Sequence, residues 1–290
     1  MSSSVLDGSR KPPAIAYLAN LFPSPLEPYV VEEIRELRKR GIGVVPCSAR
    51  RATVSHDHWQ SWVDETVCLQ PLQVIFAIQA CWLCVRRFAL LREFIRRISV
   101  SGKEPLRRRL RALLHTWLGA YYALRLAKHG VQHIHVHHGY FASWVAMVAA
   151  RLLGIPFSMT LHGSDLLLHA VYLDLKLEHC SFCMTISEFN RNHILERYPQ
   201  VDASKIVIQR MGVDSRVIKP VLPTPVDDSP LVMLAVGRLH AVKDHAFLIR
   251  ACRRLKDREL RFWCAIAGEG DERQSQPVPD AQNIHIGKHT

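Results

Sequence analysis

Residues 232–243 read Val-Met-Leu-Ala-Val-Gly-Arg-Leu-His-Ala-Val-Lys, and this pattern predicts the fold class of the chain. An apolar strand ends at Gly237, Arg238 follows it directly, and Lys243 comes five residues later. Ligands of α/β sheets bind outside the carboxyl ends of the strands, and a glycine there lets the backbone approach them closely. Arg238 offers a bidentate fork and Lys243 a mobile point charge, a pair that suits adjacent phosphates. The stretch therefore predicts a diphosphate site, with two solvated surface cations after a strand as the alternative.

Short apolar strands alternate with helices along most of the chain. The helix expected at 30–40 has an apolar face and should end at Gly41. This alternation predicts parallel, doubly wound α/β sheets. Prolines and aspartates concentrate at 216–230, so we expect a domain at 1–215, a linker at 216–230 and a second domain at 231–290. The expected strands of the first domain are 14–18, 42–46, 134–138, 157–161, 183–186 and 206–209.

The composition is that of a folded, basic protein. Of its 290 residues, 48% are hydrophobic, which supports packed cores and argues against disorder. The formal net charge of +12 predicts an acidic partner, such as nucleic acid, an anionic membrane or a phosphorylated ligand. The N-terminal residues lack the basic and apolar regions of a signal peptide, so we expect a cytoplasmic chain with reduced cysteines.

Two cysteine pairs have Cys-x2-Cys spacing, namely Cys81/Cys84 and Cys180/Cys183. A zinc site would need the pairs to converge, yet their separation in sequence far exceeds that of known zinc ribbons. Both pairs lie in apolar sequence, where a free cysteine behaves as a small core residue. We therefore expect core cysteines and no metal site.

Residues 69–128 predict a basic helical insertion in the first domain. Its apolar run at 74–85 is too short to span a bilayer. Basic amphipathic helices lie on anionic membrane surfaces, which predicts membrane docking; the alternative is a surface helix packed on the domain. Nucleic acid is not expected as a partner, because no stacking platform or known module accompanies the charge. The apolar residues that recur at helical spacing among the arginines are Phe88, Leu91, Phe94, Ile95 and Ile98.

Histidines gather where the expected strand 134–138 ends. His133, His135 and His137 alternate along the strand, so their side chains point the same way, and His138 follows. A buried parallel strand is normally apolar on both faces, so these imidazoles need polar partners or a place near the sheet edge. Lining of a cleft, structural hydrogen bonding and metal binding are the three alternatives.

Seven segments together resemble, in the same order, the GT-B glycosyltransferases, in particular the retaining family 4-like enzymes of bacterial polysaccharide and lipid biosynthesis. The spacing Gly-Arg-x4-Lys resembles their donor-site signature. This resemblance implies a GT-B fold with two Rossmann-like domains. It also implies sugar transfer, with retention, from a UDP- or GDP-linked donor to a polysaccharide or lipid-linked acceptor. No divalent metal is implied, and the enzyme would be peripheral at the inner face of the cytoplasmic membrane. The other six matching segments are 17–23, 133–137, 160–165, 184–188, 211–214 and 267–270.

The resemblance further implies roles for single residues. His162 follows the expected strand 157–161 and would contact the sugar or acceptor near the reacting carbon. Arg238 and Lys243 would neutralise the donor diphosphate. Asp165 either caps the turn after His162 or hydrogen-bonds the sugar. The donor glycines would be Gly237, Gly268 and Gly270, and the acceptor side would hold Glu27, His137 and Asp165.

The chain departs from the pattern of that family in two places. Residues 26–29 read Leu-Glu-Pro-Tyr where a polysaccharide subgroup has Ser-Glu-Thr-Phe, so Glu27 is kept and both hydroxyls are gone. The acidic Glu-x7-Glu loop of the family has no counterpart in 271–290. We therefore expect a C-terminally truncated, incomplete second domain with an exposed apolar face. The alternative to an active enzyme is a non-catalytic membrane- or glycan-binding remnant.

Overall fold

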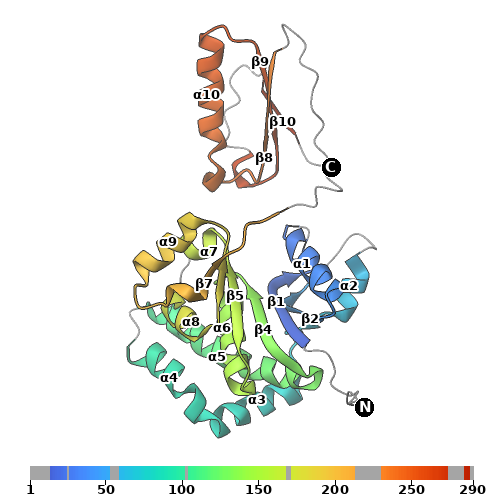
Figure 1. Ribbon diagram of the computed structural model, residues 1–290, viewed down its shortest axis with the longest axis vertical. Coiled ribbons are helices and arrows are strands. Elements are labelled where there is room, and N and C mark those ends of the chain that lie inside the picture. The colour runs from blue at the N-terminus through green and yellow to red at the C-terminus, as the bar shows by residue number, and fades with distance from the viewer. Residues whose placement is uncertain are drawn as a thin grey trace, which may run out of the picture. The chain divides into compact units, whose positions relative to one another are not determined.

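The computed structural model describes residues 14–24, 26–52, 59–101, 104–167, 171–212, 230–273 and 284–287. The chain divides into two compact units, Met1–Val213 and Asp214–Thr290 (Figure 1). Of the expected linker at 216–230, only Pro230 is among the described residues.

Unit 1 is built on a seven-stranded parallel sheet with the order β3-β2-β1-β4-β5-β6-β7. This order reverses direction between β1 and β4, which is where ligands bind in doubly wound sheets. The predicted fold class is therefore confirmed for this unit. The strands are β1 (Ala14–Phe22), β2 (Gly43–Arg51), β3 (Val67–Cys68), β4 (Val131–His137), β5 (Phe157–Leu161), β6 (Cys183–Thr185) and β7 (Ile206–Ile208).

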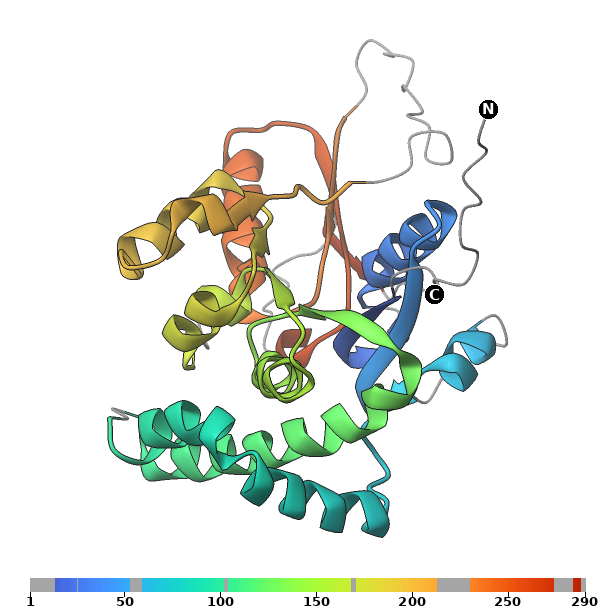
Figure 2. The ribbon, with the colours of Figure 1, turned by 60° about the horizontal axis from the view of Figure 1, so that its bottom comes forward.

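Helices cover both faces of this sheet. On one face, α1 (Pro28–Lys39) and α2 (Gln60–Glu65) bury apolar side chains against β1 and β2. On the other face, α6 (Phe141–Leu153) packs on β4 and β1, and α5 (Leu106–Leu126) packs on α6 (Figure 2). Gly41 ends α1 with φ of 78°, as predicted, because glycine adopts the left-handed conformation without strain. After α6, unit 1 also contains the helices α7 (Ser164–Leu167), α8 (Leu173–His179) and α9 (Glu188–Arg197).

The insertion between β3 and β4 contains α3 (Val74–Arg86) and α4 (Phe88–Ser99) before α5. Most of the apolar face of α4 is buried, with Leu91, Phe94 and Ile98 each 0% exposed, although Phe88 at its start is 50% exposed. The expectation that this face docks on a membrane is therefore wrong, and the packed alternative is correct. An apolar stripe at helical spacing fits a protein core as well as it fits lipid, so periodicity alone could not distinguish them.

The helix α3 instead presents apolar side chains to solvent. Within the described parts of the chain, no single helix is long and apolar enough to cross a bilayer. The pair α3 and α4, bent by 88°, meets that standard by length and composition only when the two are taken together. The exposed apolar residues of α3 are Val74, Ile75, Ile78, Trp82 and Val85.

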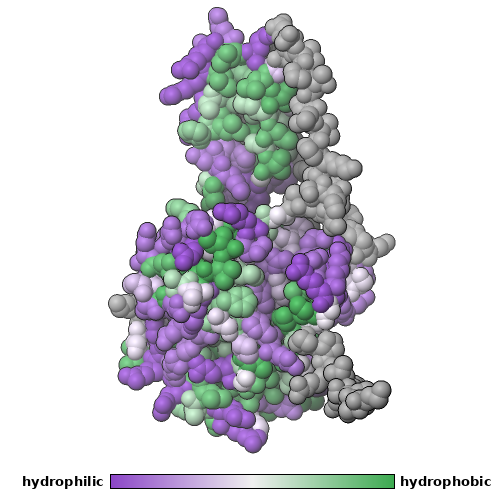
Figure 3. Space-filling view, in the orientation of Figure 1, coloured by the Kyte–Doolittle hydropathy of each residue, from purple (hydrophilic) through white to green (hydrophobic). Residues whose placement is uncertain are grey.

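Unit 2 has a three-stranded parallel sheet with the order β10-β9-β8. Its strands are β8 (Leu231–Val236), β9 (Phe262–Ala267) and β10 (Ile284–Gly287). The helix α10 (His245–Asp257) packs on one face through Ile249 and Cys252. Of the side chains that the structure describes, Val232, Leu234 and Val236 of β8 are 64–69% exposed. Figure 3 shows a hydrophobic patch on the visible face of this unit.

Candidate active site

A cluster of polar side chains lies at the carboxyl ends of β4 and β5 in unit 1. His137 is the last residue of β4 and pairs in register with Thr160 of β5. His138 follows with φ of 70°, and His162 follows the last residue of β5. Glu27, the residue directly before α1, lies at the same edge, since its carboxylate reaches His138. Thus the predicted residues Glu27, His137 and His162 meet at one edge of the sheet.

His137 links two polar groups while being completely buried. Its Nδ1 lies 3.4 Å from Nε2 of His162, and its Nε2 lies 3.2 Å from Oε2 of Glu33. The hydroxyl of Tyr17 donates to the same carboxylate of Glu33. Burial opposes ionisation of Glu33, but its hydrogen bonds with His137 and Tyr17 outweigh burial and lower the pKa of this carboxyl. Glu33 is therefore ionised and fixes the ring of His137.

His138 is the cationic member of the cluster. Its Nε2 lies 2.6 Å from Oε1 of Glu27 and its Nδ1 lies 3.7 Å from Oδ2 of Asp165. Burial acts to lower the pKa of His138, but the interactions with the carboxylates of Asp165 and Glu27 prevail and raise it to about 9. At neutral pH, His138 is therefore a buried imidazolium between two carboxylates.

Asp165 joins the loops that follow β4 and β5. Its carboxylate accepts hydrogen bonds from the backbone N–H of Gly139 at 2.8 Å and of His162 at 3.0 Å. The side chain is fully buried, and these bonds together with His138 hold the pKa of Asp165 below its usual range against the effect of burial. Asp165 therefore caps the turn after His162, the first of the two alternatives for this residue. Both of its oxygens are engaged by the protein.

His162 is held through its backbone on both sides. Asp165 accepts from its N–H, and Nδ2 of Asn190 in α9 donates to its carbonyl oxygen at 3.0 Å. Burial lowers the pKa of His162 to about 4, and the positive charge of the neighbouring His138 adds to this effect. The half-buried ring is thus neutral at physiological pH. It can exchange hydrogen bonds with a sugar hydroxyl but cannot act as a resident cation.

His133 and His135, which precede His137 in β4, form structural hydrogen bonds. Nε2 of His133 lies 2.7 Å from Oγ of Ser158, and His135 contacts Ser158 at 2.8 Å and Thr160 at 3.0 Å. These hydroxyls on β5 are the polar partners that a histidine in a central strand requires. Structural hydrogen bonding is thus the correct alternative for His133 and His135, whereas His137 and His138 line the strand-end site.

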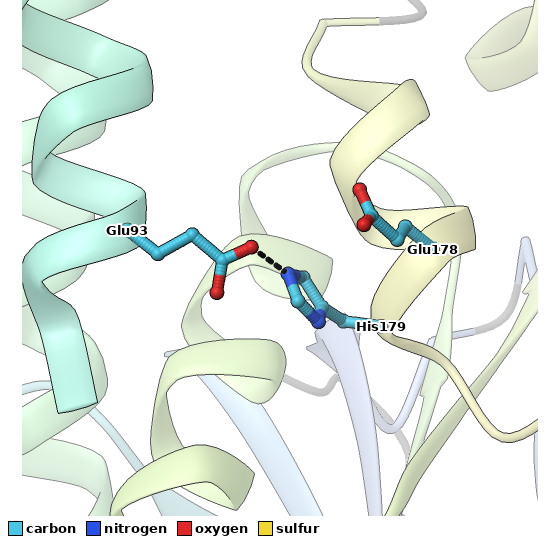
Figure 4. Close-up of side chains that lie close together, drawn as sticks. All are labelled: Glu93, Glu178 and His179. Carbon is cyan, nitrogen blue, oxygen red and sulfur yellow. Dashed lines mark hydrogen bonds and ion pairs between the residues drawn. The ribbon is translucent and has the colours of Figure 1, made fainter.

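A metal-like group occurs elsewhere in unit 1. Among the described residues, Glu93, Glu178 and His179 bring ligand atoms close together (Figure 4). However, the guanidinium of Arg151 lies 3.0 Å from Nδ1 of His179 and 3.4 Å from the carboxylate of Glu93. This cation offsets part of the negative charge and already contacts His179 and Glu93, so the geometry does not favour a metal ion there.

The two Cys-x2-Cys pairs differ in their burial. Cys180 and Cys183 are buried, as expected of core residues. Cys84 is half-buried and Cys81 is exposed, so the expectation of a core role was wrong for Cys81. The reason is that α3 turns much of its apolar surface to solvent.

In unit 2, the predicted donor residues lie in the loops that follow β8 and β9. The side chain of Lys243 folds over Gly237, because a Cβ added to Gly237 would lie 3.7 Å from three carbons of that lysine. A Cβ on Gly268 would overlap the carbonyl oxygen of Gly237, so the ends of β8 and β9 approach as closely as two glycines permit. A Cβ on Gly270 would likewise overlap the carbonyl oxygen of Leu239.

Two cations of the loop after β8 face solvent. Arg238 and Lys243 are exposed, and the described residues include no carboxylate in an ion pair with either of them. The carbonyl of Arg238 accepts from Nε2 of the buried His245, which anchors the loop to the first turn of α10. The loop therefore presents two exposed positive charges on a backbone fixed by tight packing.

Sequence reasoning missed several residues of the unit 1 site. Glu33, Tyr29 and Asn190 contact the histidines, and Lys176 donates through Nζ to the carbonyls of Gly139 at 2.7 Å and Tyr140 at 3.1 Å. The only signal in the sequence was a carboxylate, Glu33, within the largely apolar first turns of α1. Its partner could not be named without the pairing of β1 with β4.

Comparisons with known proteins agree with this architecture. Residues 26–217 match Glycosyltransferase Family 4. A glycosyltransferase from Rickettsia africae ESF-5 is 18% identical with a TM-score of 0.63, covering 97% of this chain and 69% of that one. Anabaena HepE, solved in complex with UDP-glucose, is 13% identical with a TM-score of 0.57, covering 96% of this chain and 69% of that one.

A third similar structure is an enzyme of another class. The UDP-GlcNAc 2-epimerase from Neisseria meningitidis, bound to UDP-GlcNAc, is 13% identical with a TM-score of 0.52, covering 96% of this chain and 72% of that one. At such identities the structural likeness establishes the fold alone. No match was found among curated proteins. The family match spans more than half of the chain, and the fold agrees with the GT-B glycosyltransferases: the chain belongs to Glycosyltransferase Family 4.

Proposed function

We propose that this chain transfers a sugar, with retention of configuration, from a nucleotide-sugar donor to a lipid-linked or polysaccharide acceptor. The observation that carries the proposal is the loop of unit 2, where Lys243 folds over Gly237 beside the exposed Arg238. Similar folds were solved with UDP-glucose and with UDP-GlcNAc, which favours UDP over GDP as the first donor nucleotide to test.

The two cations act on the leaving group. As the bond from the sugar to the nucleoside diphosphate breaks, negative charge accumulates on the diphosphate oxygens. Fixed charges on Arg238 and Lys243 therefore stabilise the transition state more than the ground state. In this proposal they take the place that a divalent metal has in other transferases, so transfer should persist in the presence of EDTA.

On the acceptor side, the strand-end cluster orients a neutral imidazole. Asp165 and Asn190 fix the backbone of His162, while Nδ1 of His137 holds one ring nitrogen of His162. The other ring nitrogen can exchange a hydrogen bond with a hydroxyl of the sugar or acceptor near the reacting carbon. The imidazolium of His138 keeps Glu27 ionised, and the pKa of Glu27 is lowered by that hydrogen bond although burial opposes it. Glu27 can thereby accept a hydrogen bond from an acceptor hydroxyl.

We also propose that the enzyme works as a peripheral protein at the inner face of the cytoplasmic membrane, with α3 as the contact. Ile78 and Trp82 are 65% and 60% exposed, and Ile75 lies on the same side of the helix. The guanidinium of Arg86 lies 4.8 Å from the ring centroid of Trp82, at the end of the same helix. An apolar face with cations at its end suits a surface of anionic lipids.

The decisive test of the donor site is the melting temperature of the full chain with UDP and with GDP at up to millimolar concentration. We expect a nucleotide to raise the melting temperature, because a ligand that binds only the folded state stabilises it. The rise should disappear in Arg238→Ala and in Lys243→Ala. Arg254→Ala is the matched control, since it removes an exposed arginine from α10 of the same unit.

Three outcomes separate the candidate functions. A rise that is lost in both loop variants and kept in Arg254→Ala supports the donor site and justifies transfer assays, with the anomeric configuration of the product read by NMR. A rise that survives in the loop variants refutes the assignment of Arg238 and Lys243. Cooperative melting without any nucleotide effect favours the non-catalytic remnant instead.

A further inference from the structure

Unit 1 contains a cavity that the site described so far does not use. Its volume is about 620 Å³, and it lies at the edge where β1 and β2 end. The last two residues of β2, Arg50 and Arg51, contribute to its lining, and the first half of α5 adds Arg108 and Arg111. Segments distant in sequence thus bring four guanidinium groups to one cavity.

Within the described residues, no carboxylate balances the charge of this cavity: none of those that line it is an aspartate or a glutamate. Other arginines of unit 1 are paired, as when Arg97 contacts Glu104 at 3.1 Å and Asp174 at 3.0 Å. None of the four cavity arginines forms such an ion pair with a carboxylate in the part of the chain that the structure describes. A concave surface with several unpaired guanidinium groups attracts a phosphate, which they can grip in bidentate fashion.

One wall of the cavity is apolar and aromatic. Trp144 and Tyr172, both buried, line it with their ring centroids 5.0 Å apart. Trp144 and Tyr172 are only 2% and 3% exposed, so the accessible part of this wall comes from Leu21, which is 39% exposed, and from the half-buried Phe141. Arginines on one side and apolar side chains on the other suit a phosphate ester with an apolar substituent better than a free inorganic anion.

The cavity adjoins the strand-end histidines through a shared loop. Gly139 and Tyr140 line it, and the ring of Tyr140 stacks on His138 with centroids 5.6 Å apart. The N–H of Gly139 is bound to Asp165, which also holds His162. Nζ of Lys176 donates hydrogen bonds to the backbone carbonyls of both of these loop residues. A ligand in the cavity would therefore lie beside the cluster that carries His162.

We propose that this cavity binds the phosphate or diphosphate group of the acceptor, as an ester with an apolar chain, through Arg50, Arg51, Arg108 and Arg111. This inference rests on the proposed transfer reaction and specifies its acceptor: a phospho-linked lipid whose reactive end reaches the histidines past Tyr140. The binding step itself requires no donor, so it can be tested apart from transfer.

The test is isothermal titration of the full chain with geranyl diphosphate, a short, soluble prenyl diphosphate, and with inorganic diphosphate. All proteins carry Arg238→Ala and Lys243→Ala, so that the donor loop cannot contribute. Into this background, Arg108→Gln and Arg111→Gln are introduced together. Arg107→Gln is the matched control, because Arg107 is an exposed neighbour on α5 that does not line the cavity.

We expect the prenyl diphosphate to bind more tightly than inorganic diphosphate, and its affinity to fall about tenfold or more in the double cavity variant. The Arg107→Gln control should bind as the background does. The inference is overturned if the prenyl diphosphate does not bind, if the control loses as much affinity as the cavity variant, or if both ligands bind equally. The nucleotide-dependent melting of the otherwise natural chain reports the donor site separately, so failure of one proposal is distinguishable from failure of the other.

Discussion

Nε2 of His138 lies 2.6 Å from Oε1 of Glu27, although 111 residues separate them in sequence. Glu27, directly before α1, therefore contacts His138 from one side. Asp165, which follows β5, contacts His138 from the other. The result is one charged histidine, His138, next to one neutral histidine, His162, with ring centroids 4.5 Å apart. Their opposite pKa shifts give the cluster a fixed arrangement of charge at neutral pH.

The raised pKa of His138 predicts a pH dependence of stability. Its pKa of about 9 in the folded chain exceeds the ordinary value of about 6.5. The unfolded chain therefore binds fewer protons between these values, so the stabilisation is complete below about pH 6.5 and is lost as pH rises through about 9. Glu27→Gln should lower the pKa of His138 and flatten this decline, as measured by urea unfolding from pH 6 to 9 and by NMR titration of the imidazole.

Glu32→Gln is the control for that variant. Glu32 lies in α1, the helix that Glu27 precedes, and its carboxylate pairs at the surface with Arg35 at 2.5 Å. Surface pairs of this kind contribute little to stability, so the control should keep the pH profile of the natural chain. Identical profiles for Glu27→Gln and Glu32→Gln would contradict the role of Glu27.

The lowered pKa of His162 predicts that this residue stays neutral through the physiological range. Because its pKa is about 4, kcat/KM should show no inflection from His162 between about pH 5.5 and 8. His162→Ala should lower kcat by roughly 10²-fold while leaving the nucleotide-dependent rise in melting temperature intact, since the donor loop is in unit 2. Full activity of His162→Ala in a transfer assay would exclude its catalytic role.

Gly119 lies where α5 packs on α6, so a substitution there tests how closely these two helices are packed. A Cβ at this position would lie 2.6 Å from Cβ and Cγ1 of Val148 and 3.1 Å from the carbonyl oxygen of Val145. Gly119→Ala should therefore destabilise unit 1 by about 1–3 kcal/mol, through overpacking. Thermal unfolding measures this, and Gly212→Ala is the control, because a Cβ there meets no atom within 4 Å. Equal melting temperatures for both variants would show that the two helices can separate without cost.

The exposed face of α3 predicts binding to anionic liposomes. Ile78→Glu combined with Trp82→Glu should weaken binding about tenfold or more, because both apolar burial and charge complementarity are lost. Gln79→Glu is the control, since it adds negative charge at an exposed site of the same helix without removing apolar area. Flotation with phosphatidylglycerol vesicles distinguishes them. Unchanged binding of the double variant would remove α3 from the membrane proposal.

The outcome for α3 and α4 shows where sequence periodicity stops being informative. Both helices were expected from their patterns, and α4 has the more regular apolar stripe. In the structure that stripe is buried at Leu91, Phe94 and Ile98, whereas the less regular α3 is exposed. A stripe indicates that a face will be covered, but only the neighbouring helices decide whether protein or solvent lies opposite.

The sequence by itself determined most strands of unit 1 and their order along the chain, although it did not reveal α2 and β3. The apolar run at 157–161 became β5 with those bounds, and Gly41 ends α1 in the left-handed conformation. These features depend on local physics: alternation of strand and helix, and the conformational freedom of glycine. The motif of Gly237, Arg238 and Lys243 likewise lies within a few residues, so its grouping could be predicted.

Only the tertiary structure decided which polar groups face one another. Glu27 with His138, Glu33 with His137, and Arg50 with Arg108 at one cavity join residues that the sequence keeps far apart. Such pairings depend on the order of β2, β1, β4 and β5 in the sheet and on the packing of α5 against α6. The free energy of a buried charge depends on the partners that surround it, and long-range packing alone supplies those partners.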